Sequence, residues 1–359
     1  MNRGLEELAA LGQSVWLDSI SRSMIESGDL ERLIDAGVAG MTSNPAIFKA
    51  AISDSGDYDS AIRTLSGRGK TVEQIYDDLT VADIQAAADR FLGVFTRTLG
   101  NDGFVSLEIN PLLADDAAAT IREGRRLWEK VSRPNLMLKV PATEAGFEAV
   151  EELAAEGKNV NVTLIFSREQ YRRAAAAWKR GVARLSALGG DASIPRSVAS
   201  VFVSRVDTEV DSRLSRLGPE AGAGDLGGRA AVANCLLLGG DFTASASDAA
   251  PAPVQRVLWA STGTKNPAYG DLKYVEELAG GPSVNTMPPA TFGALIDHGR
   301  FEDRLGRGPG DSAEVVERLA RLGVDIDEVC RELLSAGLEA FNLSFRALLA
   351  GIEAKAAGT

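Results

Sequence analysis

The sequence is poor in histidine and cysteine, the two side chains on which many active sites are built. Its 359 residues include two cysteines, Cys235 and Cys330, and one histidine, His298. Two cysteines are too few for a disulfide framework or a thiolate metal site, and we expect both to be small buried residues. One histidine excludes a histidine-rich metal centre and permits a Ser-His-Asp triad only if His298 fills it. Because Gly299 follows it, as at a helix C-terminus, we favour a structural role for His298.

Positive charge and long apolar runs are also scarce. Lys plus Arg total 38 against 50 for Asp plus Glu, so the net charge is −12. This balance argues against a nucleic-acid-binding surface, which needs a basic footprint, but not against a small cationic pocket for a phosphorylated metabolite. The first residues mix acidic with apolar side chains, unlike a secretory signal, and no apolar run approaches the ~18 residues of a membrane span. We therefore expect a cytoplasmic protein, monomer or homodimer, that binds neither nucleic acid nor a membrane.

Eight short, apolar or β-branched segments alternate with sequence of helical character. They are residues 14–18, 39–43, 104–109, 136–140, 160–164, 197–202, 257–261 and 282–285. Alternating strands and helices indicate a parallel sheet, and eight such units predict a (β/α)8 barrel. The alternative is a doubly wound open sheet, which is disfavoured because no G-x-G-x-x-G or P-loop motif opens a helix.

The segments between the predicted strands carry apolar residues at helical spacing. The clearest are residues 71–99, with Thr71 as a candidate cap, and residues 115–131, 143–156 and 168–188. Low-complexity composition predicts loops at 218–228 and 245–253, and 301–312 reads as a connection. Because 313–355 holds helical sequence without strands, we expect one barrel domain over 1–359, with 313–359 a helical C-terminal extension packed on it.

In such a barrel the active site lies at the C-terminal ends of the strands. The polar residues there are Asp18, Asn44, Glu108, Lys139, Thr163, Ser200 followed by Arg205, and Ser261 followed by Lys265. Lys139 is the strongest signal, because an ammonium inside the apolar run LMLKVP costs several kcal/mol unless it is paired or deprotonated. Burial favours the neutral amine, which attacks carbonyl groups. A lysine in a barrel strand with nearby carboxylates and few metal ligands suggests Schiff-base chemistry.

Each of these residues also has a structural interpretation. Lys139 and Glu108 could form an ion pair and nothing more. The remaining alternatives are Asp18 or Asn44 as a helix cap, Thr163 as an ordinary strand residue, and Arg205 as the start of a solvated helix.

Seven stretches resemble transaldolase, in its longer bacterial subfamily. They are VWLDSISR, GMTSNPAIF, VSLEINP, LMLKVPAT, NVNVTLIFS, SVASVFVSRVDTEVD and LWASTGTKNPAY, in the family's order between about residues 5 and 350. The resemblance implies a class I aldolase-type barrel that uses neither metal nor organic cofactor. It also implies transfer of a dihydroxyacetone unit between sugar phosphates, as in the non-oxidative pentose phosphate pathway.

The resemblance assigns a role to each candidate residue. Lys139 would form the Schiff base, and Asp18 would move the proton of the substrate's C4 hydroxyl. Glu108 and Thr163 would hold the water that forms and hydrolyses the imine. The substrate-binding residues would be Asn44 and Ser200 at the dihydroxyacetone part, Phe202 beside them, and Arg205, Ser261 and Lys265 at the terminal phosphate.

Some positions depart from the family's usual pattern. The third-strand motif reads Glu108-Ile109-Asn110-Pro111-Leu112 where E-V-D-P-R is usual, and Lys265 stands where an arginine is frequent. Residues 234–256 are short and rich in Gly, Ala, Ser and Pro where the family has a clearer helix. These departures leave alternatives open: the same transfer on another sugar phosphate in a biosynthetic pathway, an aldolase that releases dihydroxyacetone, or a catalytically silent sugar-phosphate-binding protein.

Overall fold

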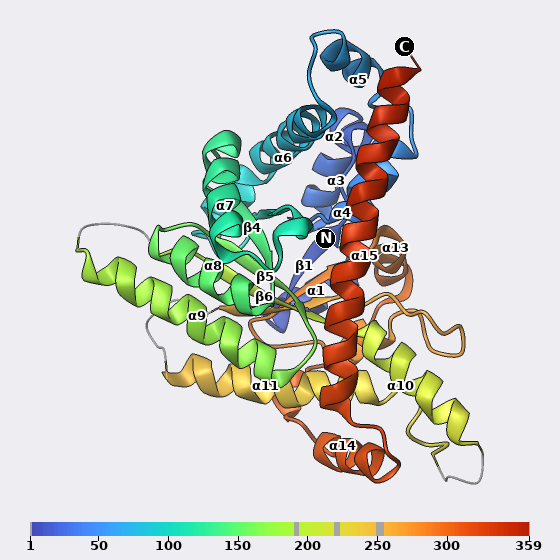
Figure 1. Ribbon diagram of the computed structural model, residues 1–359. Helices are drawn as coiled ribbons and strands as arrows, with labels where there is room; N and C mark the ends of the chain where they lie inside the picture. The colour runs from blue at the N-terminus through green and yellow to red at the C-terminus, as the bar shows by residue number, and fades with distance from the viewer. Residues whose placement is uncertain (1, 190–193, 219–222, 249–254, 359) are drawn as a thin grey trace.

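The computed structural model describes residues 2–189, 194–218, 223–248 and 255–358. Within these residues eight parallel strands pair in chain order, and β8 pairs with β1 to close a barrel (Figure 1). The predicted (β/α)8 barrel is confirmed, and the open-sheet alternative is wrong.

The strands lie close to their predicted positions. Their bounds are β1 (Ser14–Asp18), β2 (Met41–Thr42), β3 (Val105–Glu108), β4 (Leu136–Pro141), β5 (Val160–Ile165), β6 (Ser197–Phe202), β7 (Arg256–Ala260) and β8 (Val284–Met287). The largest errors are at β2 and β8, which each begin two residues later than predicted; β8 cannot begin at Pro282, because proline has no N–H to donate to the strand ladder. A register shift between Val162 and Ile165 in β5 leaves Leu164 with a φ of 58°, next to Thr163. Bulges of this kind re-aim side chains beside active sites.

Helices surround the barrel. Their bounds are α1 (Arg3–Ala10), α2 (Arg22–Glu26), α3 (Asp29–Ala36), α4 (Pro45–Phe48), α5 (Asp59–Ser66), α6 (Val72–Arg97), α7 (Ala117–Val131), α8 (Glu144–Ala155), α9 (Arg168–Ala187), α10 (Ser204–Leu217), α11 (Ala230–Asp248), α12 (Lys273–Glu277), α13 (Pro289–His298), α14 (Ser312–Arg321) and α15 (Ile326–Ala357), with the shorter turns η1 (Lys49–Ser53), η2 (Pro111–Leu113) and η4 (Leu305–Arg307). The four predicted amphipathic helices are confirmed within two residues, and Thr71 caps α6 in a capping box with Gln74.

The single histidine and the two cysteines occupy structural positions. His298 is the last residue of α13 and Gly299 caps it, as predicted. Cys235 and Cys330 are both free and buried.

One loop prediction is wrong in part. Helix α11 runs to Asp248, so the first residues of the expected loop 245–253 are helical, and residues 249–253 lie outside the described chain. Residues 234–248 are therefore helical despite their departure from the family's usual composition, since the alanines and leucines of α11 are strong helix formers. In the other predicted loop, residues 224–229 form turns and residues 219–222 lie outside the described chain.

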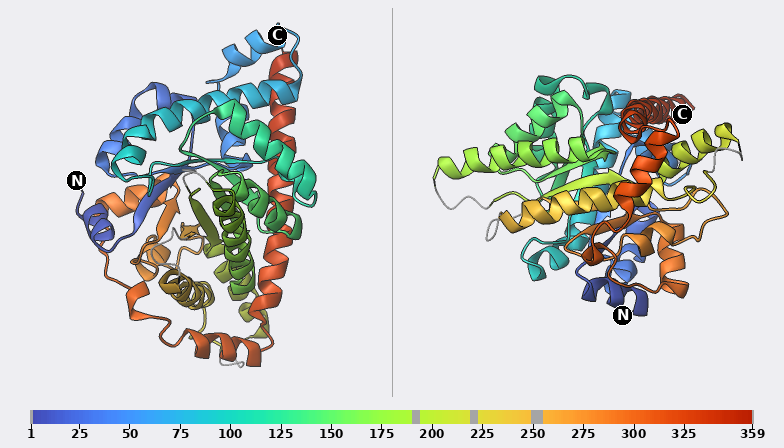
Figure 2. Two further views of the ribbon diagram at one scale, coloured as in Figure 1. Left: turned by 90° about the vertical axis from the view of Figure 1, so that its left-hand side faces the viewer. Right: turned by 90° about the horizontal axis from the view of Figure 1, so that it is seen from below.

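The C-terminal residues form two helices, α14 and α15. Helix α15 runs along the whole height of the molecule, beside the barrel (Figures 1 and 2). By length and composition alone it is the one described helix that could cross a membrane. Eight of its residues are nevertheless buried, in a stripe that includes Gly337, Phe341 and Phe345. This stripe packs on β5, α6 and α10.

The N-terminal end of the barrel is closed by a buried ion pair. Asp102, which precedes β3, accepts hydrogen bonds from Ser14 and from the Trp16 indole, and its Oδ1 lies 3.1 Å from Nη1 of Arg256. Ser14 and Arg256 are the first residues of β1 and β7, so these contacts tie the start of three strands together.

We expect Arg256→Leu to lower the free energy of unfolding by about 3–5 kcal/mol, because it leaves the Asp102 carboxylate buried without a cation. The measurement is chemical denaturation followed by circular dichroism. The double variant Arg256→Leu/Asp102→Leu should be more stable than the single one, because it removes the uncompensated charge. A double variant less stable than Arg256→Leu would contradict this account.

Candidate active site

Lys139 lies inside the barrel on β4, with only 4% of its surface exposed. Its Nζ donates a hydrogen bond of 3.0 Å to the Ser43 carbonyl and lies 3.4 Å from Oε2 of Glu108, its register neighbour on β3. The ion pair that the sequence offered as an alternative therefore exists. It does not seal the lysine off, because Lys139 also lines a cavity at the C-terminal end of the barrel.

This cavity has a volume of about 200 Å³. Nine of the ten predicted site residues line it: Asp18, Asn44, Lys139, Thr163, Ser200, Phe202, Arg205, Ser261 and Lys265. The tenth, Glu108, is buried behind Lys139 and contacts it. Seven separate chain segments thus converge on one place, as the closed barrel requires.

Asp18 faces the cavity from the end of β1. The Thr42 hydroxyl donates a 2.6 Å hydrogen bond to its Oδ1, and Thr42 Oγ1 lies 2.7 Å from Oγ1 of Thr286. Burial raises the pKa of Asp18, while the positive charge of Lys139 and the bond from Thr42 oppose the rise. The helix-cap alternative for Asp18 is wrong, because the side chain of Ser21 caps α2.

Glu108 and Thr163 are buried polar groups with unused bonding capacity. Oε2 of Glu108 and Oγ1 of Thr163 have no hydrogen-bond partner among the described residues. Burial raises the pKa of Glu108 to about 7, against the attraction of Lys139. A carboxyl that titrates near neutral pH suits proton transfer to and from water. Nowhere in the described chain do three or more His, Cys, Asp or Glu side chains gather in a way that could hold a metal ion.

Two residues expected at the dihydroxyacetone part of the substrate have protein partners of their own. Asn44 is a helix cap, as its alternative interpretation held, since its Oδ1 accepts from the backbone N–H groups of Ala46 and Ile47. The cap does not use Nδ2 of Asn44, so this nitrogen can donate a hydrogen bond to a ligand. Ser200 donates a 2.6 Å hydrogen bond to Asn161, so its oxygen can still accept one. Both side chains are therefore oriented before any substrate arrives.

The other end of the cavity is cationic. Arg205, in the first turn of α10, is half-buried, and burial lowers its pKa. Its guanidinium has no hydrogen bond or ion pair within the described part of the chain, and it lies 5.5 Å from the ring of Phe202. Lys265 is exposed at the rim. A partly buried guanidinium that has no carboxylate partner among the described residues is chemically suited to bind an anion.

The turn after β7 brings Ser261 to the same end. Its φ of 56° is unusual for a residue other than glycine and costs of order 1 kcal/mol. Two contacts with Ser204 at the start of α10 hold it: the Ser204 N–H donates to the Ser261 carbonyl, and the two hydroxyl oxygens lie 3.0 Å apart. The strained turn thus places Ser261 and Arg205 side by side.

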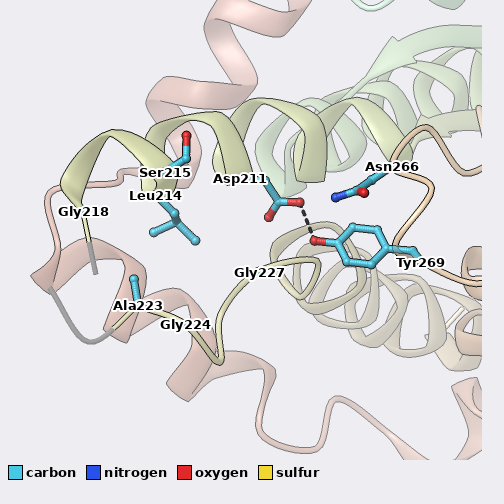
Figure 3. A pocket seen from close by; sticks show the side chains of 9 residues that line it. All are labelled: Asp211, Leu214, Ser215, Gly218, Ala223, Gly224, Gly227, Asn266 and Tyr269. Carbon is cyan, nitrogen blue, oxygen red and sulfur yellow. Dashed lines mark hydrogen bonds between the residues drawn. The ribbon is translucent and has the colours of Figure 1, made fainter. Parts of the chain in front are cut away.

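The segment that carries Lys265 is anchored from outside the barrel. Tyr269 donates a 2.6 Å hydrogen bond to Oδ2 of Asp211 on α10, and the Gly228 N–H donates to Oδ1 (Figure 3). Asp211 and Tyr269 border a larger cavity of about 450 Å³ between α10 and this loop. Because both oxygens of Asp211 are already used, we assign this outer cavity no chemistry.

Besides Ala46, Ala260, Gly263 and Pro288, sequence reasoning missed three residues of the inner cavity that carry a hydroxyl group or an aromatic ring: Thr42, Thr286 and Phe341. Thr42 and Thr286 point inward near the ends of β2 and β8, so strand position could have found them. Phe341 belongs to α15, and no local pattern distinguishes it from the other apolar residues of that helix.

Comparison with known proteins gives a consistent family. The family model described as transaldolase/fructose-6-phosphate aldolase matches residues 15–352. Transaldolase 1 of Streptomyces coelicolor is 46% identical to this chain, covering 97% of it and 93% of the relative. The transaldolase of Thiobacillus denitrificans is 44% identical, covering 97% of this chain and 99% of the relative. That of Neisseria gonorrhoeae is 41% identical, covering 96% and 98%.

The raised pKa of Glu108 makes a prediction about stability and pH. A carboxyl whose folded-state pKa is raised stabilises the fold at low pH and loses that contribution as pH rises through about 7. Relative to wild type, Glu108→Gln should therefore gain free energy of unfolding between about pH 4.5 and 7. Urea denaturation at stepped pH measures this slope. The exposed Glu129→Gln is the matched control for the loss of one carboxyl group, and equal slopes in the two variants would refute the raised pKa of Glu108.

Proposed function

The chain belongs to the transaldolase/fructose-6-phosphate aldolase family, and from that premise we propose that it transfers dihydroxyacetone units through a Schiff base on Lys139. The family makes it a transferase of sugar phosphates, with transaldolase activity. The observation that carries the assignment of residues is the position of Lys139, which is buried in β4 and yet lines the cavity that Asp18 and Arg205 share.

The first half of the proposed reaction forms the covalent intermediate. The neutral amine of Lys139 attacks the C2 ketone of a ketose phosphate, and the carbinolamine loses water to give an iminium. Glu108 and Thr163 hold and activate that water, since each has an unused buried oxygen beside the lysine strand. The Ser43 carbonyl orients the amine until the ketone replaces it.

The second half breaks and remakes the carbon chain. Asp18 takes the proton of the C4 hydroxyl, the C3–C4 bond breaks, and its electrons flow into the iminium to give an enamine. The aldose phosphate then leaves. An acceptor aldehyde takes its place, Asp18 returns the proton, and water releases the new ketose. The hydrogen bond from Thr42 holds the carboxylate of Asp18 in place for both steps; general acid–base help of this kind contributes ~10²–10⁴-fold.

Substrate orientation follows from the two ends of the cavity. Arg205, Ser261 and Lys265 bind the terminal phosphate, which places C2 toward Lys139. Asn44 and Ser200 hydrogen-bond the dihydroxyacetone hydroxyls, and Phe202 lines the wall between them. Lysine at 265 supplies charge without the bidentate fork of an arginine.

We further propose that fructose 6-phosphate and sedoheptulose 7-phosphate are the donors, in the non-oxidative pentose phosphate pathway. The third-strand departure is compatible with this, because the side chain of Asn110 turns back to accept from the Leu112 N–H and η2 follows without a gap. We propose a cytoplasmic location and a monomer or homodimer. We also propose that residues 313–359 form one domain with the barrel, since Phe341 lies in its cavity.

Incubation with fructose 6-phosphate followed by borohydride should leave a reduced sugar adduct on the peptide that contains Lys139. Lys139→Ala should abolish the adduct while its circular dichroism spectrum stays that of wild type. Mass spectrometry of the digested protein reads the position. An adduct on another lysine, or none in the wild type, would refute the mechanism and leave the silent binding protein.

Lys265→Ala should raise KM for fructose 6-phosphate about tenfold with little change in kcat, because a charged hydrogen bond contributes about 1.5–3 kcal/mol and this one is exposed. Activity on unphosphorylated fructose should not change. Lys273→Ala, on the nearby α12 but outside the cavity, is the control and should leave both constants as they are. An unchanged KM in Lys265→Ala would remove this residue from the phosphate site.

A further inference from the structure

Helix α15 presents one buried stripe to the mouth of the barrel. Gly337, Phe341 and Phe345 are spaced four residues apart and are all buried, so they lie on one face of the helix. Gly337 allows a close approach: a Cβ there would come within 3.0 Å of Leu164 Cδ2 and 3.7 Å of Arg205 Nη1. Phe345 packs edge-on against Tyr76 of α6, with ring centroids 5.2 Å apart. The helix is thus fixed on both sides of Phe341.

Phe341 is the member of this stripe that lines the inner cavity. Its ring is 5% exposed, and Nζ of Lys139 lies 5.7 Å from the ring centroid. The contact joins residues about 200 positions apart in sequence. The aromatic ring therefore forms the wall of the cavity on the side of the lysine, where the other near neighbours of Nζ are a carboxylate and a carbonyl oxygen.

We propose that Phe341 decides between transfer and hydrolysis, by keeping water from the three-carbon enamine on Lys139 until an acceptor arrives. The inference rests on the proposed Schiff-base function. The ring of Phe341 lies between the backbone of α15 and Lys139, and the residue is only 5% exposed, so it covers the lysine on the side of α15. Phe341 acts on the lifetime of the intermediate and is not required to form it.

The side reaction that the ring suppresses needs water as its only co-reactant. The enamine accepts a proton at C3 and becomes the iminium, and a water molecule then adds to C2. The C2–N bond breaks with its electrons going to nitrogen, so dihydroxyacetone is released and the Lys139 amine is restored. No oxidant or second sugar takes part, so a leak through this route turns a transferase into an aldolase.

The experiment compares two rates in each variant: dihydroxyacetone released from fructose 6-phosphate alone, and transfer to erythrose 4-phosphate. In Phe341→Ala we expect the ratio of release to transfer to rise at least tenfold, a change of about 1.4 kcal/mol in relative barrier height. Phe341→Leu, which keeps an apolar side chain of similar size, should hold the ratio within threefold of wild type. An unchanged ratio in Phe341→Ala would overturn the proposal.

Phe345→Ala is the matched control. It removes the same ring from the same face of α15, one turn onward and outside the cavity, so it loosens the helix without opening the lysine wall. A rise in the ratio as large as that of Phe341→Ala would show that helix packing alone matters, and would overturn the proposal. Borohydride trapping on Lys139 in the wild type separates the two hypotheses: its absence refutes the Schiff base, whereas trapping with an unchanged ratio in Phe341→Ala refutes only the role of Phe341.

Discussion

The structure depends on one constraint: the Lys139 side chain must be buried in the barrel and yet accessible to a substrate in the cavity. Lys139 sits in a barrel strand where its charge would be costly without neighbours, so a carboxylate at 3.4 Å and a carbonyl at 3.0 Å stand beside it. Glu108 comes from the adjacent strand β3, and Ser43 directly follows β2, so the lysine is tolerated only where the barrel brings these strands together. The interior of such a barrel is otherwise packed with side chains. The opening at its C-terminal end exists only because several strands end in small polar residues there.

Burial acts on both carboxyls of the site, those of Asp18 and Glu108, although their bonding partners differ. It raises the pKa of both, and the single positive charge of Lys139 opposes the rise in each. Two acids that share one cation cannot both be ionised cheaply, so proton position is coupled to the state of the lysine. Asp18 has an additional hydrogen bond from Thr42 that favours its charged form, whereas Oε2 of Glu108 has only its ion pair with Lys139. That difference supports Asp18 as the group that receives a substrate proton and Glu108 as the one that exchanges protons with water.

Most of the barrel could be predicted from the sequence because its strands are short apolar runs with polar ends, a local pattern. The strand ends also located eight residues of the cavity, since closure forces them to converge, and the family resemblance alone added the ninth, Phe202. Residues 245–248 were misassigned because a low-complexity run of serine and alanine predicts a loop, although alanine is also a strong helix former and α11 continues to Asp248. Phe341 could not be found because its position depends on how α15 crosses the barrel, which the tertiary packing of Gly337 on Leu164 decides. The sequence offered Asn44 both as a helix cap and as a substrate-binding residue. The structure shows that it is a cap and that the cap does not use its amide nitrogen.

The exposure of the cavity changes along its length in the way that a transfer reaction needs. At one end Lys265 lies at the surface and Arg205 is half-buried, so a phosphate held there can exchange with solvent in every half-reaction. At the other end Lys139 and Phe341 are almost fully buried, so a unit bound covalently there has little access to bulk water beyond the molecule that Glu108 and Thr163 are proposed to hold. The part of the substrate that leaves is thus bound where leaving is easy, by charges that salt and competing anions can screen. The part that stays is held by a covalent bond in apolar surroundings, where binding energy from the phosphate end has already been used to orient it. In the proposed mechanism a helix at the far end of the chain therefore matters to the chemistry, because Phe341 of α15 covers the lysine end of the cavity while the phosphate end stays exposed.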